Sequence, residues 1–171
     1  GWLRSKLIVR LLLDVDSQCL NGNGTAPNLK GIVSYATAFA PGTFATGSAN
    51  AVDSANNADV LVVAMNQIKI ANQGTQALTI QMNPTLMLDG TPILENNDIT
   101  VGSYLIGDFS KATIVQKSGI TVEVGLDGSD FTKNLRTILA EWRGQLFVQN
   151  NDTTAFVKGV FATDAAAIET A

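Results

Sequence analysis

Residues 131–143 read FTKNLRTILAEWR, and residues 155–161 read AFVKGVF. A third stretch, residues 22–32, reads GNGTAPNLKGI and forms a polar turn punctuated by glycine. This turn joins an apolar segment that ends near Leu20 to a new element that starts at Ile32. None of the three stretches contains a catalytic motif, so they are informative about the fold rather than about a reaction.

The segment from Trp2 to Leu20 predicts an amphipathic helix that the polar turn brings to an end. Charged residues interleave with apolar ones, and Gly and Asn at 21–24 tolerate the left-handed backbone that often follows a helix. The apolar residues that recur at helical spacing are Leu3, Leu7, Ile8, Leu11, Leu12 and Val15.

Residues 33–51 are mostly small and polar, so we expect irregular loop there with short strands at most. A second helix is predicted over Asn56 to Asn72, capped by Asp53 or Ser54 and ended by Gly74. Its buried side is expected to comprise Val60, Leu61, Val63, Ala64, Ile68, Ile70 and Ala71.

Beyond residue 76 the apolar pattern changes to a period of two, which is typical of strands. Short strands separated by Asn, Asp and Gly turns are predicted at 77–82, 91–94, 104–107, 113–116, 121–126 and 155–161. From Asp164 onward the Ala-rich tail is expected to fray.

The pattern over residues 131–148 is ambiguous. Leu135, Ile138, Leu139, Trp142 and Leu146 fit a helical stripe. Alternation fits as well, with Ile138, Ala140, Trp142, Leu146 and Val148 on one face of a strand. Periodicity alone slightly favours a helix.

Composition narrows the functional classes. The 171 residues suit one domain or two small lobes, and 46% are hydrophobic against 15% charged. The net charge of −4 argues against a dedicated nucleic-acid binder, and no apolar run approaches the ~20 residues of a membrane span. Without histidine, the commonest general base and metal ligand is missing. Cys19 is the only cysteine and is expected to be a small core residue.

The sequence motifs that could indicate a phosphate-binding or metal-binding site are weak. Gly22 and Gly24 lack the third glycine and the Lys of phosphate-binding loops. Residues 127–130 come closest to a calcium loop, but a plain turn is the better interpretation. We therefore predict no catalytic, cofactor-binding or metal-binding residue and no cofactor.

In their order and spacing, the three opening stretches resemble the major capsid proteins of tailed bacteriophages with the Hong Kong 97-type shell fold. The resemblance also covers residues 59–63 (DVLVV), 82–84 (MNP), 88–93 (LDGTPI) and 107–112 (GDFSKA). It implies an α+β fold in which residues 131–148 contain a long strand.

The resemblance further implies two lobes. A peripheral lobe would comprise residues 1–23 and 118–153, with the end of a long helix and long strands. An axial lobe around the five- and six-fold axes would comprise residues 24–117 and 154–171. The two lobes would share mixed, mainly antiparallel sheets and two main helices.

The implied function is structural: copies of the chain form pentamers and hexamers of an icosahedral shell. The shell encloses phage DNA without sequence-specific binding, leaves room for other virion proteins and involves no membrane. The protein would be made in the host cytoplasm, from a phage or a prophage, and reside in the virion capsid. No enzymatic activity is expected.

The polar set Asn134, Arg136, Glu141 and Arg143 is the candidate intersubunit contact. On a strand, Glu141 and Arg143 share one face while Asn134 and Arg136 lie on the other. A solvated or intersubunit charged edge is the simplest interpretation. Some members of the family also join subunits through a Lys–Asn isopeptide bond promoted by a carboxylate, and Asn134 and Glu141 resemble those two positions.

Three departures from the family pattern stand out. The N-terminal arm, hairpin loop and helix start, including the cross-linking lysine, are expected to lie before Gly1. A segment near Thr85 is expected to be missing. Residues 150–152 (NND) replace an Arg-Pro turn. From the missing parts we expect a monomer or loose oligomer in dilute solution.

Alternatives stay open. An encapsulin-type shell around a cargo enzyme shares the fold. A carboxylate-based hydrolase would need two carboxylates in a concave pocket. A phage tail adhesin module would need a compact sheet sandwich without the long first helix.

Overall fold

The computed structural model describes residues 2–72, 77–83 and 93–170. Two compact units are present: unit 1 comprises Gly1–Gly31 and Ile114–Phe147, and unit 2 comprises Ile32–Thr113 and Val148–Ala171. The predictions for Gly74 and Thr85 lie outside the described residues.

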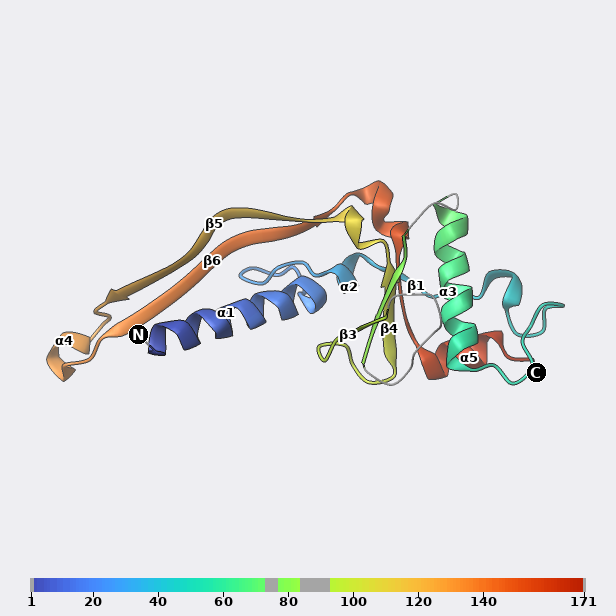
Figure 1. Ribbon diagram of the computed structural model, residues 1–171, viewed down its shortest axis with the longest axis horizontal. Coiled ribbons are helices and arrows are strands. Elements are labelled where there is room, and N and C mark those ends of the chain that lie inside the picture. Colours follow the sequence, from blue (N-terminus) through green and yellow to red (C-terminus); the bar gives the residue numbers. More distant parts are fainter. Residues whose placement is uncertain (1, 73–76, 84–92, 171) are drawn as a thin grey trace. The chain divides into compact units, whose positions relative to one another are not determined.

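Unit 1 is built from a long helix and a two-stranded sheet (Figure 1). Helix α1 spans Trp2–Asn21, as predicted, and its only buried residue is Leu20. Strands β5 (Ala112–Gly125) and β6 (Thr137–Val148) pair, and the short helix α4 (Asp130–Lys133) connects them. The prediction of two short strands over 113–126 was wrong, because β5 runs unbroken through them.

The turn after α1 shows why glycine is needed at its base. A Cβ on Gly22 would collide with the Leu29 carbonyl, and one on Gly31 would collide with the Leu20 carbonyl. The Gly31 N–H instead donates to the Gly22 carbonyl at 2.9 Å, and Gly24 adopts a φ of +73°. The predicted end of the helix in this segment is confirmed.

Unit 2 contains a five-stranded mixed sheet in the order β1-β7-β4-β2-β3. The β4 strand is antiparallel to both β2 and β7, whereas β1 is parallel to β7 and β3 is parallel to β2. The bounds are β1 Thr37–Ala38, β2 Thr79–Met82, β3 Ile93–Glu95, β4 Ser103–Gly107 and β7 Phe156–Val160.

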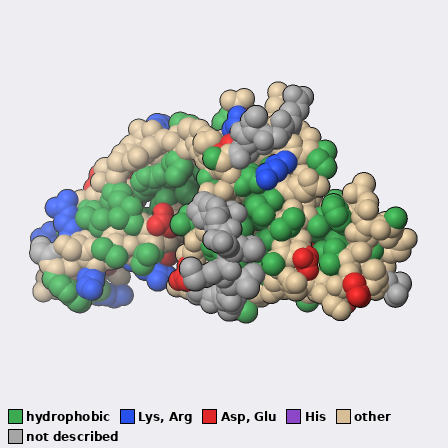
Figure 2. Space-filling view, turned by 45° about the vertical axis from the view of Figure 1, so that its right-hand side comes forward, with side chains coloured by type: hydrophobic (Ala, Val, Ile, Leu, Met, Phe, Trp, Pro, Cys, Tyr) green, Lys and Arg blue, Asp and Glu red, His purple; other side chains and the backbone are tan. Residues whose placement is uncertain are grey.

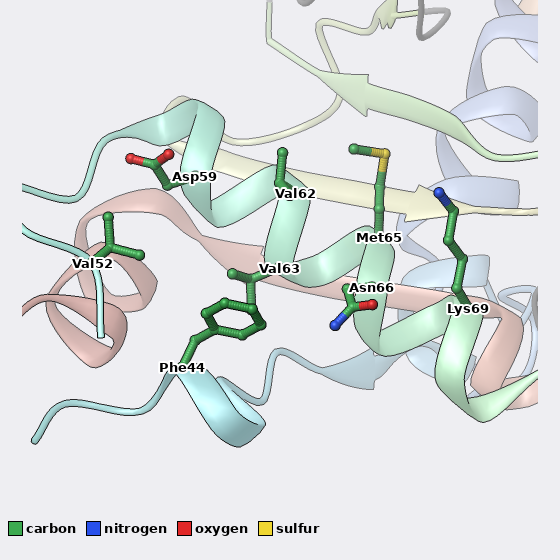
Figure 3. A pocket seen from close by; sticks show the side chains of 8 residues that line it. All are labelled: Phe44, Val52, Asp59, Val62, Val63, Met65, Asn66 and Lys69. Atoms are coloured by element: carbon green, nitrogen blue, oxygen red, sulfur yellow. The ribbon is translucent and has the colours of Figure 1, made fainter. Parts of the chain in front are cut away.

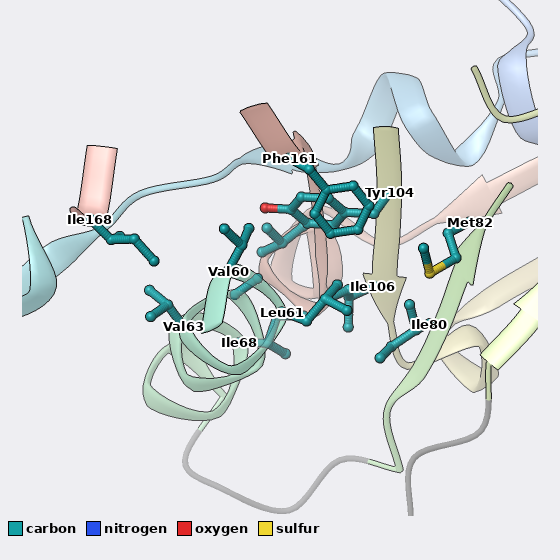
Figure 4. Packing of buried hydrophobic residues seen from close by; sticks show 12 residues of the cluster. Val60, Leu61, Val63, Ile68, Ile80, Met82, Tyr104, Ile106, Phe161 and Ile168 are labelled. Atoms are coloured by element: carbon teal, nitrogen blue, oxygen red, sulfur yellow. The ribbon is translucent and has the colours of Figure 1, made fainter. Parts of the chain in front are cut away.

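Two helices of unit 2 supply the rest of its core. Helix α3 spans Asn57–Ala71 and helix α5 spans Phe161–Ile168. Figure 4 shows Leu61 of α3 beside Ile106, and Phe161 of α5 over Tyr104, while Val63 of α3 faces Ile168 of α5. The cluster consists of Val60, Leu61, Val63, Ala64, Ile68, Ile80, Met82, Tyr104, Ile106, Val157, Phe161 and Ile168.

The N-terminus of α3 corrects the predicted cap. Asn56, rather than Asp53 or Ser54, caps the helix: its side chain accepts from the backbone N–H groups of Ala58 and Asp59. The Asp59 carboxylate in turn accepts from the Asn56 N–H at 3.0 Å. Two otherwise unpaired helix donors and the cap itself are satisfied in this way.

The C-terminal tail also differs from the prediction. Instead of fraying at Asp164, it forms α5, which packs Phe161 against Tyr104 with ring centroids 4.8 Å apart. The buried Asp164 carboxylate accepts from the Tyr104 hydroxyl at 2.8 Å and from the Val160 N–H at 2.9 Å. Burial and the Asp164 hydrogen bond raise the pKa of Tyr104 well above its usual value.

Short elements complete unit 2. Within residues 33–51, expected to be loop, the structure has β1, the 3-10 turn η1 (Gly42–Phe44) and most of the short helix α2 (Ile32–Tyr35). Two further 3-10 turns are η2 (Phe109–Lys111) and η3 (Asn150–Ala155). None of the described helices is long and apolar enough to cross a membrane.

Candidate interaction surfaces

Strand β6 presents two contrasting faces. Alternation decides the ambiguity over this segment in favour of the strand: Ile138, Ala140 and Trp142 are half-buried, and Leu146 and Val148 are buried. The intervening face exposes Leu139 and Phe147 at about half of their surface, on either side of Glu141 and Arg143. This outward face therefore combines apolar and charged groups.

Glu141 and Arg143 form an ion pair on that face. The Arg143 Nη2 atom donates to Glu141 Oε2 at 3.1 Å, and the side chains of Arg143 and Glu141 are 64% and 37% exposed, respectively. The prediction that both residues share one face is confirmed. An exposed pair contributes little to folding, and the remaining guanidinium N–H groups can bind a partner.

Asn134 and Arg136 do not lie on the strand, contrary to the prediction. They follow α4, and β6 begins only at Thr137. The Asp130 carboxylate explains the shift, because it accepts from the Thr137 hydroxyl at 2.6 Å and from the Asp127 N–H at 3.0 Å. We call the segment between β5 and β6 that contains α4 the tip. These two hydrogen bonds hold the tip closed and lower the pKa of Asp130.

The structure separates Asn134 from Glu141. Asn134 adopts a left-handed φ of 56° at the end of α4. Glu141 lies four residues into β6, about 13 Å from the strand's first residue at ~3.3 Å per residue. The four candidate residues thus form two sites, a charged pair on β6 and a polar tip.

A third feature is the extent of exposed apolar surface in unit 1, whose location was not predicted from the sequence. Figure 2 shows hydrophobic side chains spread over the part of the surface at its left, which belongs to this unit. The exposed large hydrophobic residues are Trp2, Leu3, Val9, Leu12, Leu13, Ile114, Val115, Val124, Leu126, Phe131, Leu135, Leu139 and Phe147.

Unit 2 carries an apolar groove along α3 (Figure 3). It encloses about 480 Å³ and is lined by Phe44, Val52, Asp59, Val62, Val63, Met65, Asn66 and Lys69. A second hollow of about 280 Å³ shares Phe44, Val63 and Asn66 and extends to Ile70. Ile70 was predicted to be buried but is 73% exposed, because it lies about 200° around the helix from Ile68.

Neither groove resembles a catalytic centre. Their described lining residues include one carboxylate, Asp59, which is engaged in capping α3, so these residues do not supply the carboxylate pair that a hydrolase of this kind requires. The described residues include no group of three Cys, Asp or Glu side chains able to hold a metal ion. Partial burial and the charge of Asp16 raise the pKa of the half-buried Cys19 thiol, which disfavours its reactive thiolate.

Comparisons with known proteins agree with the fold. The chain is 27% identical over 188 residues to the major capsid protein of Enterobacteria phage HK97, covering 95% of this chain but 46% of that relative. Because 188 exceeds the chain's 171 residues, the aligned part of the relative contains residues that have no counterpart here.

Solved structures with similar folds are also phage-type capsids. One is the capsid of an empty GTA particle (TM-score 0.64, 16% identity, 94% of this chain and 65% of that one). Another is the procapsid of satellite phage P4 (TM-score 0.62, 16% identity, 92% of this chain and 65% of that one). The predicted α+β shell fold is confirmed. The Phage capsid family matches residues 1–161, and the chain belongs to that family.

Proposed function

We propose that this chain is part of a shell subunit that associates with copies of itself to form a phage capsid. The family and the names of the relatives support a structural role in the virion rather than an enzymatic one. The chain spans about half the length of the curated relative, so the proposal concerns the complete protein that contains it.

The exposed apolar surface of unit 1 is the observation that carries the proposal. Of the 18 exposed large hydrophobic residues described, 13 lie in unit 1, although it is the smaller unit. Burying such residues is favourable by about 25 cal/mol per Å² of apolar surface. A contiguous exposed apolar surface marks an interaction site, and repeated copies of the chain can cover one another.

We base the proposed division into lobes and the proposed contacts between subunits on the family pattern. We assign the long helix and the paired strands to a peripheral lobe, residues 1–23 and 118–153, and the remainder to an axial lobe. Axial lobes would meet in pentamers and hexamers. The outward face of β6 and the tip at Asn134 and Arg136 would contact neighbouring subunits, and the acidic chain would enclose DNA without reading its sequence.

Electron microscopy of the complete protein tests the proposal. Expression in a bacterial host should yield closed particles of uniform size. Recovery of monomers alone, under conditions that keep the protein folded, would contradict a shell role.

A variant pair connects the particles to the apolar surface. Leu139→Ser should reduce particle yield severalfold while the thermal unfolding temperature of the subunit changes little, because Leu139 is 52% exposed on β6. Gln145→Ser, on the same face of β6, is the control and should assemble normally. Equal yields from the two variants would remove this face from the interface.

A further inference from the structure

Three dipeptides of unit 1 place glycine directly after an Asn or Asp residue. They are Asn21-Gly22 and Asn23-Gly24 at the turn after α1, and Asp127-Gly128 in the tip. Figure 1 shows the end of α1 and helix α4 of the tip at opposite ends of this unit. A fourth pair, Asp89-Gly90, lies outside the described residues. Such pairs can rearrange their own main chain, because glycine has no side chain to hinder attack by its nitrogen.

The rearrangement proceeds through a cyclic imide. The glycine nitrogen gives its proton to solvent and bonds to the side-chain Cγ, and ammonia leaves from Asn or water leaves from Asp. Water then opens the succinimide ring at either carbonyl, which gives Asp or isoaspartate. In isoaspartate the main chain runs through Cβ and Cγ, so it is one carbon longer. The first step requires a glycine N–H that is not held by a hydrogen-bond acceptor.

The turn after α1 holds both of its glycine N–H groups. The Gly22 N–H donates to the Gln18 carbonyl at 2.8 Å, and Gly22 is buried. The Gly24 N–H donates to the Leu29 carbonyl at 2.8 Å. The Leu29 N–H in turn donates to the Gln18 side-chain Oε1 at 3.0 Å, which fixes the acceptor of Gly24. Either glycine nitrogen can therefore attack only after the turn opens locally.

The side chain of Asn23 is held as well. Its Oδ1 accepts from the Thr25 N–H at 3.0 Å and from the Asn28 Nδ2 at 3.3 Å. Asn23 also forms an antiparallel bridge with Lys30 across the turn. These contacts tie both the nitrogen and the carbon of the reaction to the loop that closes the turn.

The tip leaves the corresponding groups accessible. Asp127 and Gly128 are both exposed, and within the described part of the chain the Gly128 N–H has no acceptor. The Asp127 carboxylate likewise accepts no hydrogen bond from a described residue and forms no ion pair with one. At Gly128 even an added Cβ would meet nothing within 4 Å. The reaction can therefore start here without opening of the fold.

We propose that Asp127 is a site of spontaneous isoaspartate formation in the folded subunit, whereas the turn after α1 protects Asn21 and Asn23. This inference does not depend on the shell role. The modified segment would nevertheless be the tip, which we have assigned to contacts between subunits, so the age of a subunit would change that surface.

The contacts of Asp127 explain what the modification would do. Its carbonyl accepts from the Asp130 N–H at 2.9 Å, and its N–H donates to Asp130 Oδ2 at 3.0 Å. The Asp130 carboxylate also accepts from the Thr137 hydroxyl, at the start of β6. Isomerisation turns the Asp127 carbonyl into part of a free carboxylate and lengthens the chain before Asp130. The tip should therefore loosen.

Peptide mapping of aged protein tests the assignment. Unassembled subunits of the complete protein are kept dilute in mildly acidic buffer, where part of the Asp carboxyl is protonated and water can leave. The same protein unfolded in guanidinium chloride gives the reference rate. Isoaspartate at position 127 should form in the folded protein within about threefold of that rate, because no opening is required. A slower folded rate would overturn the proposal for Asp127.

The variant Asp127→Asn places the same dipeptide in both environments of one molecule. In mildly alkaline buffer, which favours loss of the amide proton, position 127 should deamidate at least about tenfold faster than Asn21 or Asn23 in the folded protein. In guanidinium chloride the three positions should react at similar rates. Similar rates in the folded protein would overturn the contrast between the tip and the turn.

Two substitutions at Gln18 test the protection. Gln18→Ala removes the acceptor of the Leu29 N–H and should speed deamidation of Asn23 severalfold. The matched change Gln18→Glu keeps a side-chain oxygen there and should leave the rate near that of the wild type. Circular dichroism checks that α1 is retained in both. An unchanged rate in Gln18→Ala would overturn the protective role assigned to the turn.

Proteolysis reads out the loosened tip. Trypsin should cleave after Lys133 or Arg136 severalfold faster in aged wild-type protein than in fresh protein. Asp127→Glu is the control, because its longer side chain would have to close a six-membered ring and so resists the reaction. Aged and fresh Asp127→Glu protein should be cleaved alike. Equal cleavage of aged and fresh wild-type protein would overturn the predicted loosening.

Discussion

Unit 1 and unit 2 distribute their apolar residues in opposite ways. Leu20 and Leu146 are the only buried hydrophobic residues described in unit 1, whereas unit 2 contains a continuous cluster between α3, α5 and the sheet. The contrast indicates that unit 2 obtains its stability from its own core and that unit 1 leaves apolar surface for contacts with other molecules.

The architecture of unit 1 explains this difference. A two-stranded sheet is marginally stable alone in water, and a single helix can cover only part of its surface. In a shell, neighbouring subunits can provide the missing cover. Substitutions in unit 2 should therefore act mainly on folding, and those on the exposed face of unit 1 mainly on assembly.

The largest expected effect comes from Leu61→Ala. Leu61 is fully buried in the unit 2 cluster, so truncation should lower the free energy of unfolding by about 2–5 kcal/mol. The matched change Leu13→Ala, at a residue 56% exposed on α1, should change it by less than about 0.5 kcal/mol. Urea denaturation measures the free energy of unfolding of both variants. Similar losses in the two variants would contradict the contrast between the units.

The next effect concerns the Tyr104–Asp164 hydrogen bond. Tyr104→Phe leaves the buried carboxylate with one fewer donor, which should cost about 1.5–3 kcal/mol at neutral pH. Since the raised pKa keeps Tyr104 protonated in the folded state, the unfolded state loses its proton first, above about pH 10. Stability should then fall by up to about 1.4 kcal/mol per pH unit.

The Tyr104→Phe variant tests whether Tyr104 causes the loss of stability at high pH. The Tyr104→Phe protein should lack this component, so the difference in stability between the two proteins should shrink above pH 10. In Tyr35→Phe, where Tyr104 is the only tyrosine, absorbance at 295 nm should rise only with unfolding. A rise in the folded protein near pH 10 would show that Tyr104 is not protected.

A smaller effect is expected at the cap of α3. Asn56→Ala removes a side chain that accepts from two backbone N–H groups and should cost about 1 kcal/mol. Asp53→Ala, at one of the two cap positions that the sequence suggested, should cost less, since among the described residues the Asp53 carboxylate accepts only a long 3.4 Å hydrogen bond from the Thr170 hydroxyl. Thermal unfolding distinguishes the two, and a larger loss from Asp53→Ala would contradict the observed cap.

Sequence predicted the elements whose signals are local and long. Helix α1, most of α3 and strands β2, β3, β4 and β7 follow from apolar periodicity and polar turns. The β5 strand was divided in two because Gly119 suggested a turn, yet a Cβ there would meet only the Gln116 side-chain amide, at 3.9 Å. Helix α5 was missed although Phe161, Ala165 and Ile168 already showed helical spacing.

The candidate surfaces were harder to predict from the sequence. Glu141 and Arg143 were placed on one face because alternation fixes it, but the tip depends on Asp130 reaching Thr137, a contact that no local propensity encodes. The groove along α3 forms from segments around Phe44 and Val62, and only tertiary structure brings these together. One signal was available: α3 is apolar almost all round, which suggests a partner on each side.

The smallest expected effect on folding is that of Glu141→Gln. The ion pair with Arg143 is exposed, so its loss should lower the free energy of unfolding by less than about 0.5 kcal/mol. If the outward face of β6 contacts a neighbour, the same change should reduce particle yield of the complete protein severalfold, because the desolvated Arg143 would lose its partner. Unit 1 would then show an assembly defect without a folding defect. A folding loss that exceeds the assembly loss would place Glu141 among residues that hold the subunit itself together.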